Sequence, residues 1–379
     1  MLNYFLWYPI IWMLVLLLYS FGFSSFNEPL DIGLLFFILL TSVVSLIFGI
    51  AYKKEFKFNT RCKLGNKDYI PVIIISIATI IEFICMKQVP LFAVLIFKNA
   101  KYQSFHPIPM YHVILITSVC YFSLKYFCCL IYDKKNRKNS FLYLISMLCI
   151  FALYNYRSFI LIFIFMALNI YLEYLKKKKI INKKHILLSI LIVIIGLYFF
   201  GILGNLRQHQ KWNDCSYIEE IGLYNYFPSF IPKEYMWAYS YITSPLANLN
   251  YNIKNSNFKL NFISAIGEIF PETISKRIQS SSTKPILIKK YFNVSTGWVN
   301  SYNNGSYIGM YFLFSYLCFL GFIGLKIKKQ KKQNANFLMF CSYMTVIFSF
   351  MFFDNMISYV GTSLPFWITF IILYRGRKI

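Results

Sequence analysis

Ten stretches of this 379-residue chain are apolar over a length that crosses a lipid bilayer. A membrane-spanning helix needs about 20 mostly apolar residues, because it rises ~1.5 Å per residue through ~30 Å of hydrocarbon. Isolated backbone polar groups are costly in lipid, so helices are the expected form. We therefore predict an all-α polytopic integral membrane protein with about ten transmembrane helices, at residues 4–21, 31–52, 69–86, 110–132, 140–156, 157–175, 185–204, 306–325, 336–353 and 358–374.

Composition supports this class. Hydrophobic residues make up 58% of the chain and its mean hydropathy is +0.53, which excludes an ordinary water-soluble globule. The formal net charge of +25 would suit nucleic acid, but basic runs such as KKKK at 176–179 directly follow a predicted span. Lys and Arg at such positions set membrane orientation, so we expect no nucleic-acid partner.

The basic residues also predict which way the chain faces. Alternate connections between the predicted spans hold 24 Lys and Arg in one set and 14 in the other. Because cytoplasmic loops carry the excess of positive charge, both termini and five short basic connections are predicted to be cytoplasmic. The N-terminal segment lacks a basic start and a small-residue cleavage site, and we expect it to stay in place as the first span.

One long stretch interrupts the predicted spans. We divide the chain into residues 1–204 with helices one to seven, 205–305 as a large outward-facing loop of partly helical character, and 306–379 with helices eight to ten and a cytoplasmic tail. Chemistry outside the bilayer should belong to 205–305, which mixes basic, acidic, amide and aromatic side chains.

Several kinds of site are not supported by the sequence. The nine cysteines lie mostly inside apolar segments and form no CxxC pair, which argues against a disulfide framework or a zinc site. No DxD or comparable acidic cluster suggests a divalent metal, and the GxSxG, HExxH and P-loop motifs are missing. We therefore expect metal-independent chemistry and no cofactor.

Charged residues within or beside the spans call for an explanation, because ionised groups in lipid are costly and usually paired. Lys125 should pair internally or line a wet cavity. Glu82 lies near an outer boundary, where we expect it to snorkel to the surface, and Asp354 ends the ninth span in FFDNM. Arg157 lies between spans five and six on the outer side, where it could snorkel or hold a phosphate with its bidentate guanidinium.

The loop holds further candidates. Arg207, His209 and Lys211 follow span seven, and they could solvate the helix end or, with Lys276 and Arg277, neutralise an anion. The segment EYMWAYSYITSPLANLN should be an aromatic interfacial helix, with Tyr241 on a surface that could also stack on sugars, and Pro245 should end or kink it before Asn248. Glu268 and Glu272 are candidate general bases.

In layout and motifs the chain resembles the bacterial O-antigen polymerases, a family of oligosaccharide repeat-unit polymerases. The resemblance rests on ten or so spans with one large outer loop late in the chain, on YITSPLANLN at 241–250, and on NVSTGWVNSYNNGSYIGM at 293–310. Family members commonly carry an acidic residue before the Gly that opens the span after the loop, and this chain has Asn304 there.

The resemblance implies transfer of a glycan from undecaprenyl pyrophosphate to a newly flipped lipid-linked repeat unit, at the periplasmic face of the bacterial inner membrane, in lipopolysaccharide biosynthesis. The implied partners are an undecaprenyl-pyrophosphate-linked oligosaccharide, membrane lipid and a chain-length regulator. On this interpretation the candidate catalytic residues are Arg157, Arg207 and Arg277, which offset the charge of the pyrophosphate, and His209, Glu268 and Glu272, which act on the acceptor hydroxyl. The candidate substrate-binding residues are Lys211, Tyr241, Asn248, Lys276, Asn293 and Thr296.

Two other functions remain open at this stage. An O-antigen ligase uses the same donor but delivers the glycan to lipid A core. A lipid-linked oligosaccharide flippase makes no bond, and it is disfavoured by the hundred-residue outer loop, since such transporters spread their polar residues through the helix bundle.

Overall fold

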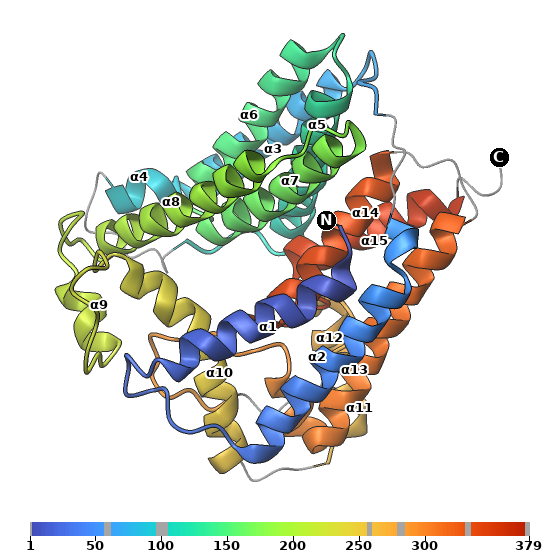
Figure 1. Ribbon diagram of the computed structural model, residues 1–379. Coiled ribbons are helices and arrows are strands. Elements are labelled where there is room, and N and C mark those ends of the chain that lie inside the picture. Colours follow the sequence, from blue (N-terminus) through green and yellow to red (C-terminus); the bar gives the residue numbers. More distant parts are fainter. Residues whose placement is uncertain are drawn as a thin grey trace.

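The computed structural model of the chain describes residues 2–56, 62–95, 105–255, 260–278, 285–329 and 335–375. Within these ranges the long elements are all helices, and one isolated antiparallel bridge joins Ser24 to Tyr224. This architecture confirms the predicted all-α class (Figure 1).

Each of the ten predicted spans contains one helix. They are α1 (Tyr4–Ser20), α2 (Ile32–Ala51), α3 (Tyr69–Met86), α5 (Tyr111–Tyr132), α6 (Arg137–Leu153), α7 (Arg157–Lys177), α8 (Lys183–Arg207), α13 (Val299–Lys329), α14 (Ala335–Ser349) and α15 (Val360–Arg375). The other α-helices are α4 (Pro90–Leu95), α9 (Ser216–Ile221), α10 (Tyr235–Asn255), α11 (Phe262–Gly267) and α12 (Glu272–Ile278), and short 3₁₀ helices follow α2 (η1, Lys53–Phe56) and α14 (η3, Phe350–Phe352).

Among the described residues, seven helices are long and apolar enough to cross a membrane: α2, α3, α5, α7, α8, α13 and the segment Ala335–Phe352 that contains α14. Helices α1 and α15 are apolar but shorter, with 17 and 16 residues. Helix α6 opens with two basic residues and is not in either group. These helices indicate a membrane protein, and the count of ten crossings stays a prediction.

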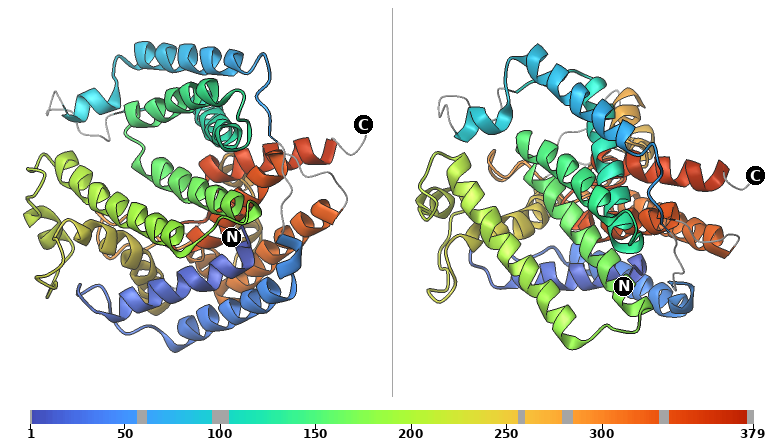
Figure 2. Two further views of the ribbon diagram at one scale, coloured as in Figure 1. Left: turned by 45° about the horizontal axis from the view of Figure 1, so that its top comes forward. Right: turned by 90° about the horizontal axis from the view of Figure 1, so that it is seen from above.

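Helix α14 forms the centre of the bundle. Of the residues in Ala335–Phe352, 83% are buried, whereas only 17% of those in the most apolar stretch of α8 are buried. Helix α14 packs against α1, α5, α7 and α15. Figures 1 and 2 show α1, α2 and α13 on one side of it and α3 and α5–α8 on the other. The outward face of α8 is a run of exposed Ile and Leu side chains, which suits contact with lipid.

Helix α13 is broken near its start. Ser306 has a left-handed backbone (φ 51°, ψ −152°), so residues 299–305 form a short separate helix ahead of the long apolar one. The predicted start of a span at residue 306 coincides with this break. The short helix packs against α11, where the backbone N–H of Asn261 donates to the carbonyl oxygen of Asn304 at 2.9 Å.

Helix α10 is the longest helix that lies wholly within the 205–305 segment, and most of its residues are buried. It packs against α1, α8 and α13, and its residues from Thr243 to Asn250 are all buried. Of the two outcomes expected at Pro245, an end or a kink, the first is wrong, because the helix continues to Asn255. Proline removes one backbone hydrogen bond within a helix. Packing against three neighbouring helices offsets that loss here.

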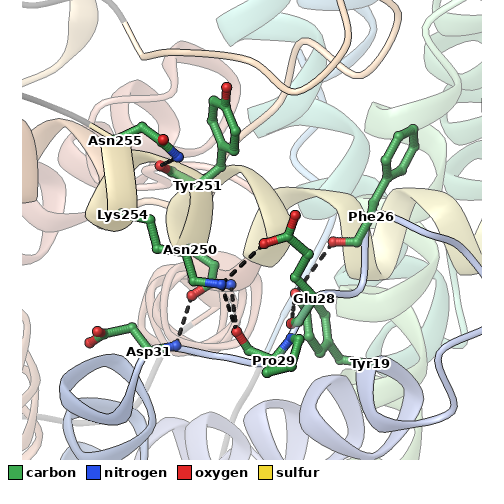
Figure 3. Close-up of polar contacts among 9 residues, drawn as sticks. All are labelled: Tyr19, Phe26, Glu28, Pro29, Asp31, Asn250, Tyr251, Lys254 and Asn255. Carbon is green, nitrogen blue, oxygen red and sulfur yellow. Dashed lines mark hydrogen bonds and ion pairs between the residues drawn. The ribbon is translucent and has the colours of Figure 1, made fainter.

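The connection between α1 and α2 is fastened to the end of α10 (Figure 3). The Asn250 amide oxygen accepts from the backbone N–H of Asp31 at 2.8 Å, and its nitrogen donates to the carbonyl of Pro29 at 3.2 Å. Lys254 pairs with Glu28 at 3.1 Å. Segments more than 200 residues apart in the sequence thus form one end of the bundle.

The structure shows the surroundings of two charged residues within the predicted spans. Lys125 is paired internally, as expected, with its ammonium 2.7 Å from the carboxylate of Asp68. The expectation that Glu82 snorkels to the surface is wrong, since its side chain is fully buried and hydrogen bonded to its neighbours. Specific partners stabilise a buried carboxylate that the sequence alone would send to the surface.

Candidate functional site

A polar cavity of about 140 Å³ lies where the segment before α13 meets the turn after α14. Its volume corresponds to about five water molecules. It is lined by Pro285, Asn293, Val294, Ser295, Thr296, Gly297, Val299, Asn300, Asp354 and Asn355. Two residues predicted from the sequence, Asn293 and Thr296, are therefore brought together at one cavity.

Gly297 allows the two walls of the cavity to approach each other. Its N–H donates to the carbonyl of Met351 at 2.8 Å. A Cβ at this position would lie 2.6 Å from the Met351 methyl group, 2.9 Å from the Asp354 carbonyl oxygen and 3.0 Å from Cα of Asn355. Two of these atoms belong to the backbone, so only glycine fits without moving the turn.

Asparagines of α10 hold the extended segment that forms the first wall. The Asn248 amide donates to the carbonyl oxygens of Phe292 and Val294, at 2.9 and 2.7 Å. Asn252, one turn later, exchanges hydrogen bonds with the backbone of Ile286 at 2.7 and 3.0 Å. The amide nitrogen of Asn248, which the resemblance made a candidate substrate-binding residue, thus donates to the backbone of the wall.

Asp354 is the carboxylate on the opposite wall. Burial raises its pKa to about 6, the Glu272 and Glu268 carboxylates add to this effect, and a hydrogen bond from the Asn355 N–H opposes it. Glu268 is itself buried and accepts a hydrogen bond from the Asn355 amide at 3.1 Å. A carboxylate with a pKa close to neutral can exchange a proton with a bound hydroxyl group.

Ser295 supplies a second sign that the cavity takes a polar ligand. Its side chain is 8% exposed, and its hydroxyl has no hydrogen-bond partner among the described residues. A buried hydroxyl without a partner is uncommon and normally bonds to a water molecule or a ligand.

A row of aromatic rings connects this cavity to Arg157. The Arg157 guanidinium lies over the Phe200 ring, 4.8 Å from its centroid. Phe200 meets Tyr241 edge to face at 5.1 Å, and Tyr241 stacks on Phe353 at 6.1 Å and 20°. Phe353 directly precedes Asp354, which lines the cavity, so α7, α8, α10 and the turn after α14 contribute to one row of contacting side chains in which Phe200 is buried.

The remaining predicted residues lie away from the cavity lining. Arg207 ends α8, and His209 and Lys211 are exposed in the turn that follows it. His209 has a left-handed backbone (φ 60°) and bonds back to the end of the helix. Within the described residues, none of these three lines the cavity.

Helix α12 carries the other predicted charges. Glu272 and Lys276 form an exposed ion pair at 2.5 Å, and Arg277 is exposed beside them. The N–H of Glu272 donates to the carbonyl oxygen of Ser358 at 2.8 Å, which ties α12 to the turn that carries Asp354. These basic side chains lie on the surface next to the candidate site.

In the described ranges, no group of three or more His, Cys, Asp or Glu side chains is placed to hold a metal ion. No family model, no curated protein and no solved structure matches this chain.

Proposed function

We propose that this protein is an O-antigen polymerase. It transfers a growing glycan from undecaprenyl pyrophosphate to a sugar hydroxyl of a lipid-linked repeat unit, at the periplasmic face of the bacterial inner membrane. The observation that carries the proposal is the row of contacting side chains that runs from Arg157 through three aromatic rings, ending at Phe353, the residue before the cavity-lining Asp354.

The groups at the two ends of this row suit the donor and the acceptor of a glycosyl transfer. A guanidinium is always charged and its planar fork fits phosphate oxygens, so Arg157 holds the pyrophosphate of the donor. Asn293, Ser295 and Thr296 offer hydroxyl and amide groups for the acceptor sugar at the other end.

In the proposed reaction the acceptor hydroxyl oxygen attacks the anomeric carbon of the donor. The bond between that carbon and the pyrophosphate oxygen breaks, and undecaprenyl pyrophosphate leaves with the bonding electron pair. The hydroxyl proton passes to Asp354, whose raised pKa fits the role of general base near neutral pH. Glu268 and Glu272, predicted bases in the sequence, contribute by raising that pKa.

The test uses purified protein in lipid bilayers with undecaprenyl-pyrophosphate-linked repeat units. The expected product is a ladder that grows by one repeat unit per step. Arg157→Ala should abolish the ladder, and Arg157→Lys should restore it only in part because the bidentate fork is lost. Lys233→Ala is the matched control, since Lys233 is an exposed basic residue of the 205–305 segment that pairs with Glu219 and does not line the cavity.

Added lipid A core separates polymerisation from ligation. A glycan that forms only when lipid A core is supplied would identify a ligase, and the polymerase proposal would then be wrong. Lipid-linked units that cross the bilayer without any new glycosidic bond would identify a flippase.

A further inference from the structure

A groove of about 380 Å³ lies along the end of α3, on the outside of the bundle. Helix α3 is at the edge of the bundle (Figure 2), and only 28% of its residues are buried. The groove is therefore open to the lipid that surrounds a membrane protein, away from the cavity at Asp354. Its lining residues come from α3 and from the connection to α4, and they are Ile80, Phe83, Ile84, Lys87, Gln88 and Val89.

Most of the groove is apolar. Ile80 and Ile84 lie about one helical turn apart on α3 and are 56% and 68% exposed. The Phe83 ring is held from behind by the Tyr154 ring, with 4.8 Å between the two centroids. One helical turn spans ~5.4 Å, so the groove holds a short stretch of one hydrocarbon chain. Lipid tails are the apolar groups that a bilayer supplies beside a spanning helix.

Lys87 places a positive charge at one end of the groove. Its side chain is exposed, and within the described residues it forms no ion pair. The whole connection from residue 87 to residue 109 holds three Lys and no Asp or Glu. Lys87 directly follows an apolar helix that is long enough to cross a membrane. The end of such a helix lies at the level of the lipid headgroups, where the phosphates are.

The backbone holds Lys87 in a fixed position. Its φ is 51°, its N–H donates to the carbonyl oxygen of Ile84 at 3.2 Å, and the next N–H donates to that of Phe83 at 3.3 Å. Glycine is the usual residue at this place in a helix ending of this kind, because it has no Cβ to oppose the left-handed backbone. The helix dipole favours a cation here, which accounts for the charge but not for the apolar groove beside it.

We propose that this groove binds an anionic phospholipid of the bilayer, with its phosphate beside Lys87 and the first part of one acyl chain along the apolar side chains of α3. Charge complementarity selects this occupant. A zwitterionic lipid has the same chains but no net charge, and a water-soluble phosphate has the charge but no chain. None of the groove residues lines the cavity or belongs to the row from Arg157, so the site does not depend on the function proposed above.

The test measures lipid binding to the full-length protein, delipidated in a mild detergent, by native mass spectrometry. Dioleoyl phosphatidylglycerol and dioleoyl phosphatidylcholine are titrated separately, because they carry the same chains and differ in net charge. Phosphatidylglycerol should bind about fivefold more tightly, which is the factor expected for one basic residue near an anionic lipid. Glycerol 3-phosphate, which has the anionic group without the chains, should not displace it.

Lys87→Gly tests the charge without disturbing the fold. Glycine fits the left-handed backbone, so this variant should unfold at a temperature no lower than the wild type. It should nevertheless bind the two phospholipids equally. Lys67→Gln is the matched control, since Lys67 is exposed just before the opposite end of α3 and its substitution removes the same charge. This control should keep the preference for phosphatidylglycerol.

Ile84→Trp tests the apolar part, because the larger side chain fills the groove. It should remove the binding of one phosphatidylglycerol molecule. Ile77→Trp is its matched control: Ile77 lies roughly two turns earlier on the same face of α3, is 52% exposed and does not line the groove. The control should bind phosphatidylglycerol like the wild type.

A preference for phosphatidylglycerol that survives in Lys87→Gly would overturn the proposal, and so would equal effects of Ile84→Trp and Ile77→Trp. Farnesyl pyrophosphate serves as a further probe. If it displaced phosphatidylglycerol at a lower concentration than phosphatidylglycerol itself requires, the groove would belong to a prenyl pyrophosphate and the proposal would be wrong. The readout is lipid binding, so a protein that forms no glycan ladder would still pass or fail this test.

Discussion

Replacing Asp354 by Asn should stabilise the protein at neutral pH and remove its transfer activity. In the folded protein burial raises the pKa of this carboxyl from 3.8 to about 6. That difference corresponds to roughly 3 kcal/mol, at about 1.4 kcal/mol for each pH unit. The folded state therefore disfavours the ionised form, and Asn, which cannot ionise, avoids this contribution.

The sign follows from proton binding. Between about pH 4 and about pH 6 the folded protein binds more protons at this site than the unfolded chain, so wild-type stability falls as pH rises through this window. Asp354→Asn should thus have a higher midpoint of thermal unfolding than the wild type near pH 8. Near pH 4 the advantage should largely disappear, because both side chains are then neutral.

Asp214→Asn is the matched control. Asp214 lies in the 205–305 segment, where hydrogen bonds from the hydroxyl and N–H of Ser216 lower its pKa, so its substitution should give no stabilisation near pH 8. Thermal unfolding of the purified proteins in one detergent at both pH values provides the measurement. The raised pKa of Asp354 would be refuted if the unfolding midpoint of Asp354→Asn did not exceed that of the wild type near pH 8. It would also be refuted if the midpoint exceeded that of the wild type equally near pH 4.

Two other substitutions test the packing around the site, and a third tests a contact between two cysteines that do not line the cavity. Gly297→Ala should lose about 1–3 kcal/mol of stability and most transfer activity, because its Cβ would meet the backbone of the turn at Asp354; thermal unfolding and the ladder assay measure both. Asn248→Ala removes its hydrogen bonds to the cavity wall and should lose about 2–4 kcal/mol, measured in the same way. Cys62 and Cys129 have sulfur atoms 2.8 Å apart, so a mild oxidant should link them, with a shift in mobility on non-reducing gels that Cys62→Ser abolishes.

The helices were largely predictable from the sequence because one physical rule dominates them. Apolar length alone gave α3 its observed bounds and α5 its bounds to within one residue. The helix α10 was harder, since its continuation past Pro245 depends on contacts with helices that are distant in the sequence. Local propensity describes the chain before such contacts form, and packing overrides it.

The site was only partly predictable. Asn293 and Thr296 were singled out through a motif and do line the cavity. Asp354 was noticed as a carboxylate at the end of a span, which was the available signal, but its opposite wall comes from residues some sixty positions earlier in the chain. Sequence spacing does not show that Gly297 brings these two segments together.

Buried polar groups explain why the sequence misplaced Glu82 while it placed Lys125 correctly. Lys125 needed one partner, and Asp68 lies at the start of α3, beside the same end of the bundle. Glu82 needed several, and they come from two distant parts of the chain: Ile108 and His112 around the start of α5, and Tyr154 after α6. A carboxylate is stable in an apolar bundle only when such partners converge on it. A charged residue inside an apolar segment therefore indicates from the sequence alone that a tertiary cluster exists. The structure is needed to identify the other members of that cluster.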